Sequence, residues 1–241
     1  MKSKVFKILS IALVLTLALA FVIRLAGPNL LKMYIRAGVG DCTNIPIFCM
    51  VPNEQIIRPP IDRGFLEQAV PYKSKNLSVY LPMRFTIVEE IMKKVYYKKH
   101  RRLDKGDTVY LLRKGKGFFI NLFPQLARQG VGDDFEFIKR VMYARFERIN
   151  SIADAFFMIM KGIFIPDLGD QRTVRMAYVE TDEKKGFINY NFTKDGNFFD
   201  CNIIGKDGSF YKMYIKDRGR RLLLPEVITM VNSLDFSYKL R

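Results

Sequence analysis

The sequence contains no tryptophan, one histidine and three cysteines among its 241 residues. It also lacks the G-x-S-x-G motif of hydrolases, the H-E-x-x-H motif of zinc proteases and the G-x-x-x-x-G-K-[ST] phosphate loop. These absences exclude the enzyme classes that those motifs mark. We therefore predict a protein that is not an enzyme and has neither a cofactor nor a metal ion. An unrecognised hydrolase or transferase is the enzymatic alternative.

Acidic residues are few relative to basic ones. The chain has 40 lysines and arginines against 24 aspartates and glutamates, which gives a net charge of +16. Residues 1–26 contain no acid and four of the positive charges, so the remainder carries +12. A field of that sign attracts phosphates, acidic glycans, anionic lipid headgroups or an acidic protein surface. The charge alone does not select among these partners.

Charge is absent from Ile8–Ile23 (ILSIALVLTLALAFVI), and three lysines precede this apolar run. From Val5 the stretch is 19 residues interrupted only by Lys7, which is about the length of one bilayer crossing in a helix. We predict that residues 1–26 form a signal anchor, a single transmembrane helix with its N-terminus in the cytoplasm. The rest of the chain is then expected in the periplasm or the extracellular space, attached to the cell membrane.

Two other interpretations of this segment stay open. Ala18-Leu19-Ala20 has the small-residue pattern of a signal-peptidase site, which would make the segment a cleaved signal peptide. An apolar helix buried in the core is the second alternative. No cysteine follows the run directly, and this argues against bacterial lipidation.

Residues 27–75 are predicted to form an amphipathic stretch and a proline-rich, cysteine-containing linker. Gly27-Pro28 should end the anchor, and Asn29–Ala37 can form a short amphipathic helix that rests on the membrane surface or packs on the domain. Prolines at positions 46, 52, 59, 60 and 71 then favour irregular, extended structure. The apolar content of the linker suggests that part of it is held against the domain.

Residues 76–241 carry the pattern of an α+β domain. Short runs rich in β-branched and aromatic residues predict strands, with turn residues between them. The predicted strands are Leu77–Pro82, Thr108–Arg113, Phe118–Phe123, Thr173–Thr181, Gly186–Thr193, Phe198–Ile204 and Phe210–Ile215. The predicted helices are Val88–Tyr97, Asp133–Ile149, a helix with Ser151 as its N-cap, and a last helix with Pro225 in its first turn.

Strands joined by tight turns are antiparallel, so these elements predict an antiparallel β-sheet packed with helices, an α-β-α sandwich-like fold. Lys114–Gly117 lies between two predicted strands and is expected to be a hairpin turn, not a phosphate loop. From Ile188 to Phe192 apolar side chains alternate with Asn189 and Asn191, which predicts that one face of the sheet is wetter.

This element order, with Leu77–Pro82 (LSVYLP) as a leading strand and Val231–Phe236 (VNSLDF) near the end, resembles the PsbP-like family. Domains of that family are α-β-α sandwiches that often lie outside the cytoplasmic or thylakoid membrane. The resemblance spans Asn76 to about Leu240 in element order. It implies a non-catalytic accessory or assembly role beside a membrane complex, and it implies no functional residues.

Cys42 and Cys49 have six residues between them in the stretch GDCTNIPIFCM. Zinc sites usually bring thiolates in closer pairs, completed by a second pair or by histidines, and thioredoxin-type pairs have two intervening residues. Outside the cytoplasm a disulfide between these two cysteines is therefore the leading interpretation. Two free buried thiols, or a metal site completed by Cys201 and His100, are the alternatives. Cys201 itself is expected to be a small buried residue on a strand.

A basic run interleaved with tyrosines supplies the candidate anion-binding residues, which are Lys93, Lys94, Lys98, Lys99, Arg101, Arg102 and Lys105. Cations and aromatic rings together can hold phosphates and stack on bases. Since the domain is predicted to lie outside the cytoplasm, an anionic lipid headgroup or a glycan is expected as partner rather than nucleic acid. A solvated cationic surface is the plainer alternative. Further cations that could lie nearby are Arg113, Lys114, Lys116, Arg218, Arg220 and Arg221.

Three other groups have simpler structural explanations. Asp133, Asp134 and Glu136 are typical of a helix N-terminus, where acidic residues are favoured. The acidic loop Asp167–Asp170 could hold a cation but has no recognised motif. His100 lies among cations, which disfavour its protonated form.

These observations predict a membrane-anchored, extracytoplasmic domain that binds a protein partner without catalysing a reaction, as an accessory protein of a membrane-associated assembly. Binding of an anionic polymer or a membrane surface through the basic run Lys93–Lys105 is the alternative. The sequence does not identify the partner.

Overall fold

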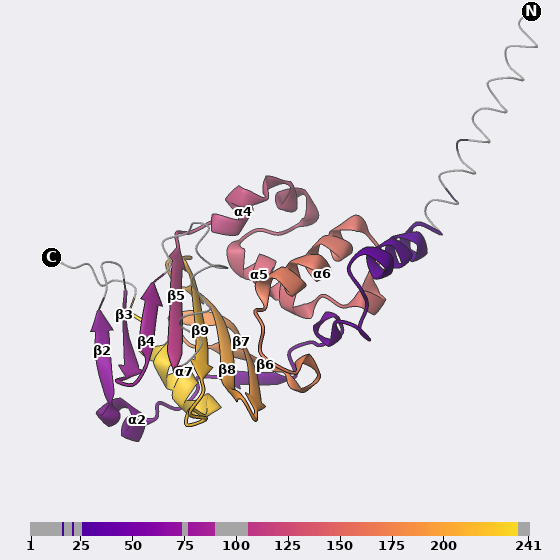
Figure 1. The fold of residues 1–241 in the computed structure, drawn as a ribbon. Helices are drawn as coiled ribbons and strands as arrows, with labels where there is room; N and C mark the ends of the chain where they lie inside the picture. Colours follow the sequence, from indigo (N-terminus) through magenta and orange to yellow (C-terminus); the bar gives the residue numbers. More distant parts are fainter. Residues whose placement is uncertain (1–15, 17–20, 22–25, 74–76, 90–105, 236–241) are drawn as a thin grey trace, which may run out of the picture.

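The computed structural model describes residues 16, 21, 26–73, 77–89 and 106–235 (Figure 1). Most of the predicted signal anchor, residues 1–26, lies outside these ranges. Within them, no helix combines the length and the apolar character needed to cross a membrane.

A seven-stranded mixed β-sheet forms the centre of the domain, with the strand order β1-β6-β7-β8-β9-β5-β4 (Figure 1). Its strands are β1 (Glu54–Ile57), β4 (Thr86–Glu89), β5 (Thr108–Lys114), β6 (Arg175–Glu180), β7 (Lys184–Thr193), β8 (Gly196–Gly205) and β9 (Phe210–Asp217). Strands β6 to β9 form an antiparallel meander, as their tight turns require. β1 lies parallel to β6, and β4 lies parallel to β5. The α+β class is therefore confirmed, whereas the prediction of an entirely antiparallel sheet is wrong.

The helices agree with several of the predicted boundaries. They are α2 (Arg63–Gln68), α4 (Phe118–Leu122), α5 (Asp134–Tyr143), α6 (Ile152–Phe164) and α7 (Leu224–Ser233), with the 3-10 turns η1 (Pro46–Phe48), η2 (Pro124–Gln129), η3 (Phe146–Arg148) and η4 (Gln171–Thr173). The side chains of Asp133 and Ser151 cap α5 and α6 as expected, and Pro225 lies in the first turn of α7. The predicted helix Val88–Tyr97 is wrong at its start, because Val88 belongs to β4; its remainder from residue 90 lies outside the described residues.

The predicted hairpin of Thr108–Arg113 with Phe118–Phe123 is wrong. β5 pairs with β9 and β4, and the second predicted strand is the helix α4. Gly117, left-handed at φ 74°, starts that helix, and a carboxylate oxygen of Asp134 accepts hydrogen bonds from the first N–H groups of α4, with 2.9 Å to the nitrogen of Phe119. The ring of Phe119 then stacks on Phe137 at 4.7 Å between centroids. Tertiary contacts thus override the strand propensity of this aromatic run.

Helices cover both faces of the sheet (Figure 1). On the side that we call the α6 face, α4, α5 and α6 enclose an aromatic core that includes Phe137, Phe187 and Phe210. The opposite side, the α7 face, is covered by α7, α2 and the antiparallel hairpin of β2 (Ala69–Lys73) and β3 (Ser78–Pro82). The layers are therefore helix, sheet and helix.

The segment before Asn76 contributes several elements to these layers. Residues 54–73 supply β1, α2 and β2. A helix over residues 26–38, here called helix 26–38, contains the predicted Asn29–Ala37 and also Gly27 and Pro28, which were expected to end a helix. Its Leu31 and Ile35 pack into the core of the α6 face. Part of the predicted linker is accordingly fixed on the domain, as its apolar content suggested.

The polar side chains of the meander lie on a buried face, not on the wetter face that their alternation predicted. Asn189, Asp200 and Asn202 are fully buried on the α6 face, where α5 contacts β7 and β8. Asp200 accepts hydrogen bonds from the amide groups of Asn189 (3.1 Å) and Asn202 (2.7 Å), and the ammonium of Lys212 lies 2.6 Å from it. We call these four residues the polar row. Burial of Asp200 is tolerated because the other three members surround its carboxylate, whereas the amide oxygen of Asn189 has no hydrogen-bond partner among the described residues.

Candidate functional site

The seven candidate anion-binding residues, Lys93, Lys94, Lys98, Lys99, Arg101, Arg102 and Lys105, all lie outside the described residues, as does His100. Their segment connects the end of β4 to the start of β5. Of the further cations, Arg218, Arg220 and Arg221 lie beyond β9, at the end of the sheet where β5 begins, because Thr108 faces Lys216. Arg113, Lys114 and Lys116 lie at the other end of β5, where Lys114 faces Phe210. Over that length of strand the two groups are about 20 Å apart. The structure therefore does not bring them together.

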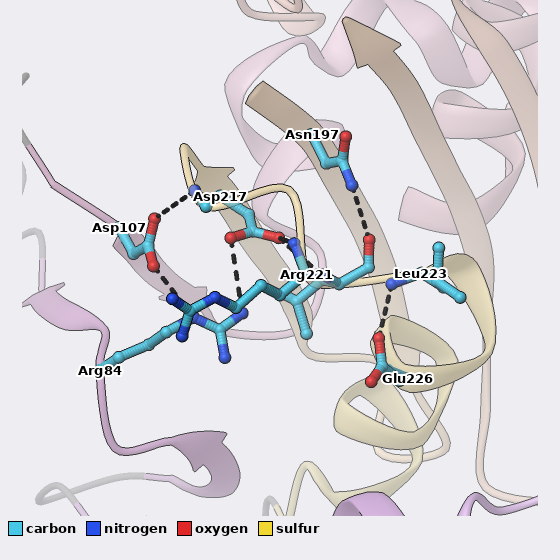
Figure 2. Close-up of polar contacts among 9 residues, drawn as sticks. Arg84, Asp107, Asn197, Asp217, Arg221, Leu223 and Glu226 are labelled. Carbon is cyan, nitrogen blue, oxygen red and sulfur yellow. Dashed lines mark hydrogen bonds and ion pairs between the residues drawn. The ribbon is translucent and has the colours of Figure 1, made fainter. Parts of the chain in front are cut away.

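A cluster of ion pairs holds the loop with Arg218, Arg220 and Arg221 against the start of β5 (Figure 2). The guanidinium of Arg84 binds Asp107 at 2.9 Å and the fully buried Asp217 at 3.4 Å. Asp217 also accepts hydrogen bonds from the backbone N–H groups of Arg221 and Leu222, at 2.7 and 2.6 Å. The carboxylates thus fasten a loop, and this accounts for their burial without a catalytic role.

The same loop leads directly into α7. The side-chain amide of Asn197 donates to the carbonyl of Leu222 at 2.9 Å, and Glu226 accepts from the backbone N–H of Leu223 at 2.6 Å (Figure 2). The N-terminus of α7 is therefore capped from within the chain, and the loop is tied at both ends.

The structure joins Cys42 to Cys49 in a disulfide, with 5.6 Å between their Cα atoms. The loop between them contains η1 and carries Phe48, which is buried against α6. Gly162 of α6 leaves room for the Phe48 ring, because a Cβ atom at position 162 would lie only 2.8 Å from that ring. The cysteine loop is thus packed on the domain as well as cross-linked.

Glu147 lies beside the two sulfurs. Its Oε1 atom is 2.6 Å from Sγ of Cys49 and 3.5 Å from Sγ of Cys42, and ligand atoms of the three residues lie within 4.8 Å of one another. This trio could hold a soft cation only as free thiolates, so the disulfide and a metal ion exclude each other. The four-ligand set weighed from sequence is not assembled here, since Cys201 is buried in the core of the α7 face.

Lys161, which the sequence prediction missed, links the cysteine loop to the helices. Its ammonium is buried and donates to the carbonyls of Met50, Met142 (2.7 Å) and Ala144 (3.0 Å). The predicted helix Asp133–Ile149 is shorter in the structure, since α5 ends at Tyr143. The carbonyls of Met142 and Ala144 at this end accept from Lys161 and do not continue the helix. Burial lowers the pKa of Lys161 to about 7; Arg145 acts in the same direction, and Glu147 opposes it. A lone lysine within the apolar run IADAFFMIMKGIF was the available sequence signal.

A cavity of about 490 Å³ lies where the β6–β7 and β8–β9 turns meet the start of α5. Its charges are mixed, and their main roles are structural. Asp133 caps α5, Lys206 pairs with Glu183 at 3.2 Å, and Lys184 donates to the end of α7, with 2.5 Å to the carbonyl of Asn232. Burial raises the pKa of Asp134. The carboxylate of this residue accepts the hydrogen bond from Phe119 that anchors the start of α4. Among the residues lining this cavity we find no nucleophile paired with a base.

The acidic loop Asp167–Asp170 also has local partners. Asp167 accepts from the N–H of Gly169 at 2.9 Å, and Asp170 accepts from the N–H of Arg172 at 3.0 Å. These are turn-stabilising contacts of the kind that aspartate makes with its own backbone. These contacts fit the simpler explanation, in which the aspartates stabilise a turn and do not hold a cation.

Helix 26–38 has a second apolar face. Its inner face packs on the domain, and Lys32 and Arg36 reinforce that contact: Lys32 donates to the carbonyl of Glu147 at 2.9 Å, and Arg36 lies over the ring of Phe146. The outer face exposes Leu30, Met33 and Tyr34, the last with 78% of its surface accessible. The helix lies beside α6, at the end of the molecule away from α2 (Figure 1).

The two stretches that carry the resemblance to the PsbP-like family are neighbours in the fold. Ser78 in β3 and Asp235 after α7 exchange two backbone hydrogen bonds, at 3.1 and 2.8 Å, while Phe236 lies outside the described residues. Neither a protein-family model nor any curated protein sequence matches this chain.

Proposed function

We propose that the protein is a membrane-anchored, extracytoplasmic accessory domain that binds a protein partner and catalyses no reaction. The observation that carries the proposal is helix 26–38, which follows the charge-free run Ile8–Ile23 and exposes Leu30, Met33 and Tyr34 while its other face is packed on the domain. Exposed apolar side chains on a helix next to a membrane segment suit contact with a bilayer or with an apolar partner.

Two further observations support the proposal. A disulfide between Cys42 and Cys49 persists in oxidising compartments, which fits a location outside the cytoplasm. The acidic groups of the cavity and of the loop Asp167–Asp170 have structural partners, and the candidate metal ligands Cys42 and Cys49 are joined in the disulfide. The resemblance to the PsbP-like family, which rests on element order, points to the same kind of role.

The test is the behaviour of the full-length protein in its native membrane. We expect it to stay in the membrane fraction after alkaline carbonate washing, and its domain to be degraded when protease is added to spheroplasts. Crosslinking before solubilisation should then recover one stoichiometric partner. Release by carbonate, or protection of the domain from external protease, would overturn the proposal.

The alternative is that the basic segment binds an anionic polymer or a membrane surface. One observation favours it: the loop with Arg218, Arg220 and Arg221 is fastened to Asp107, two residues after Lys105. Binding to anionic liposomes or glycans should then fall steeply with salt and be lost when Lys98, Lys99, Arg101 and Arg102 are changed to Gln. An absence of binding at low salt would contradict it.

A further inference from the structure

A hollow of about 250 Å³ opens between the end of α5, η3 and the start of α6. Its lining consists of Arg140, Tyr143, Ala144, Arg145, Arg148, Ala153, Asp154 and Phe157. Three arginines therefore face one small space that contains a single acidic residue.

The acid in this hollow is already engaged. Asp154 accepts hydrogen bonds from the backbone N–H of Asn150 (3.0 Å) and the hydroxyl of Ser151 (2.8 Å), as part of the cap of α6. Arg140 is engaged too, with Glu136 at 3.0 Å and the carbonyl of Gln129 at 2.8 Å. Among the described residues, Asp154 forms no ion pair with Arg145 or Arg148.

Arg145 and Arg148 are the groups without a counter-charge. Neither forms an ion pair within the described ranges, and the Nε–H of Arg145 is buried with no hydrogen-bond acceptor there. A buried donor without an acceptor is unfavourable, and the guanidinium groups of the two arginines that line the hollow are the donors that a ligand there could contact. Lys161 lies close enough to Arg145 for the two cations to repel each other, and this repulsion helps burial to lower the pKa of the lysine.

The two guanidinium groups determine what kind of ligand the hollow could bind. Two guanidinium groups present planar forks of N–H donors that match the oxygens of a tetrahedral oxyanion such as phosphate. The volume suits a phosphate and a small substituent, such as glycerol, and is small compared with the pockets that hold whole drug-sized ligands. The site is therefore suited to a phosphomonoester or phosphodiester headgroup.

The surroundings of the hollow are those of a membrane interface. η3, which follows Arg145 and ends with Arg148, is the turn that helix 26–38 contacts through Lys32 and Arg36. Ile152, directly before the lining residue Ala153, is 80% exposed, and Tyr143 on the rim is 45% exposed. Apolar and aromatic side chains beside cations are the pattern by which proteins hold anionic lipids at the headgroup level.

We propose that this hollow binds the phosphate of an anionic phospholipid, with Arg145 and Arg148 as its principal donors and Ile152 and Tyr143 against the glycerol and acyl region. The inference rests on the proposed membrane location. It assigns the end of the domain next to helix 26–38 as the surface that faces the bilayer. It also gives the excess positive charge of the domain a defined ligand class.

The test uses the full chain in a non-ionic detergent and native mass spectrometry. Short-chain phosphatidylglycerol or phosphatidic acid is expected to remain bound, and phosphatidylcholine is not. In the variant Arg145→Gln/Arg148→Gln the retention should fall on the order of tenfold or more, since two charge-assisted hydrogen bonds are removed. The control Arg63→Gln/Arg172→Gln makes the same change of charge at exposed positions on α2 and η4, and should retain lipid like the native chain.

A second arm separates lipid from soluble phosphate. Inorganic phosphate and glycerol phosphate are titrated calorimetrically into the same proteins. Binding of these anions with lipid-like affinity, lost in the double variant, would assign the hollow to a soluble phosphate and overturn the lipid assignment. Equal lipid retention by the double variant and its control would overturn the site itself. Should the double variant fail to fold, Arg148→Gln alone, at an exposed position, must still weaken retention for the proposal to stand.

Failure of this site is distinguishable from failure of the membrane location. The carbonate and protease tests report on the anchor and do not depend on Arg145 or Arg148. A chain that stays in the membrane but shows no arginine-dependent lipid retention would leave the proposed function intact and refute this inference.

Discussion

The two faces of the central sheet are both buried but are held in different ways. On the α7 face, β7, β8 and β9 contribute a continuous apolar surface of Ile188, Tyr190, Phe199, Cys201, Ile203, Tyr211, Met213 and Ile215. On the α6 face the same strands contribute the polar row together with apolar side chains such as Phe187 and Phe210. The α7 face is held mainly by non-directional apolar packing, whereas the α6 face adds to its apolar packing specific donors, such as Lys212 to the carbonyl of Phe164 at 2.7 Å.

The difference has a general physical meaning. Alternation in a strand determines which side chains share a face, but it does not determine whether the polar face is wet. Water, or a complete set of protein partners, can satisfy those groups equally well. The predictions below test the contrast, from the largest expected effect to the smallest.

The largest effect should follow from breaking the polar row. Asp200→Asn removes the charge that faces the ammonium of Lys212, and we expect it to lower the free energy of unfolding by about 3 kcal/mol or more, because a mostly buried cation is left unpaired. Denaturant unfolding measures this. The exposed pair Arg58–Asp182 is the matched control, and Asp182→Asn should cost at most about 1 kcal/mol. Equal costs for the two variants would mean that the polar row does not stabilise the α6 face through its charge.

Lys161 should make the α6 face sensitive to pH. Its folded pKa of about 7 lies below the unfolded value of about 10.4, so between these values the unfolded chain binds more protons and stability rises with pH. Relative to Lys161→Met, the native chain should gain up to about 4 kcal/mol from pH 7 to pH 10, measured by denaturant unfolding at each pH. Because Lys184 also has a pKa lowered by burial, to about 8, it contributes to the slope of both proteins and cancels in the difference. If stability rises equally with pH in the native chain and in Lys161→Met, the three carbonyls keep the ammonium of Lys161 charged in the folded protein from pH 7 to pH 10.

The cysteine loop should give a smaller effect, again on the α6 side. Reducing the Cys42–Cys49 disulfide removes the cross-link of an eight-residue loop, which should cost about 2 kcal/mol of stability. The variant Cys42→Ser/Cys49→Ser should be insensitive to reductant. Non-reducing peptide mapping should recover the two cysteines in one linked species. Finding both thiols free in protein from its native membrane would undercut the disulfide and weaken the extracytoplasmic placement.

The smallest effect is expected on the apolar face, one residue from Asp200. Cys201→Ala should cost only about 1 kcal/mol, since it removes one small buried group. Burial raises the pKa of the Cys201 thiol well above its usual value, so the folded protein should resist alkylation at neutral pH until it unfolds. Mass spectrometry after iodoacetamide treatment checks this. Rapid labelling of the folded chain would contradict the burial.

Local signals in the sequence were sufficient for the meander and the helix caps. The strands from Arg175 to Asp217 are joined by turns rich in glycine and aspartate, and the caps at Asp133 and Ser151 depend on residues within three positions. Such elements are determined by neighbours along the chain, and for this reason they were predictable.

Elements that depend on distant partners were not predictable in this way. α4 was mistaken for a strand because its start is set by Asp134, and β1 pairs with a strand more than a hundred residues later. Lys161 and the arginine hollow combine α5, η3 and α6, so their chemistry exists only after packing. The basic run Lys93–Lys105 stays a prediction, because it lies outside the described residues.

The strand order also has a consequence for how the chain is made. β1 and β4, the two edge strands, precede the meander in sequence, but β1 can pair only with β6 and β4 only with β5, which itself pairs with β9. During synthesis from the N-terminus, β1 therefore emerges more than a hundred residues before β6, and β5 emerges about a hundred residues before β9; non-local pairing of this kind is slow. The central sheet can therefore be completed only after the last third of the chain, which holds β6 to β9, has been translated.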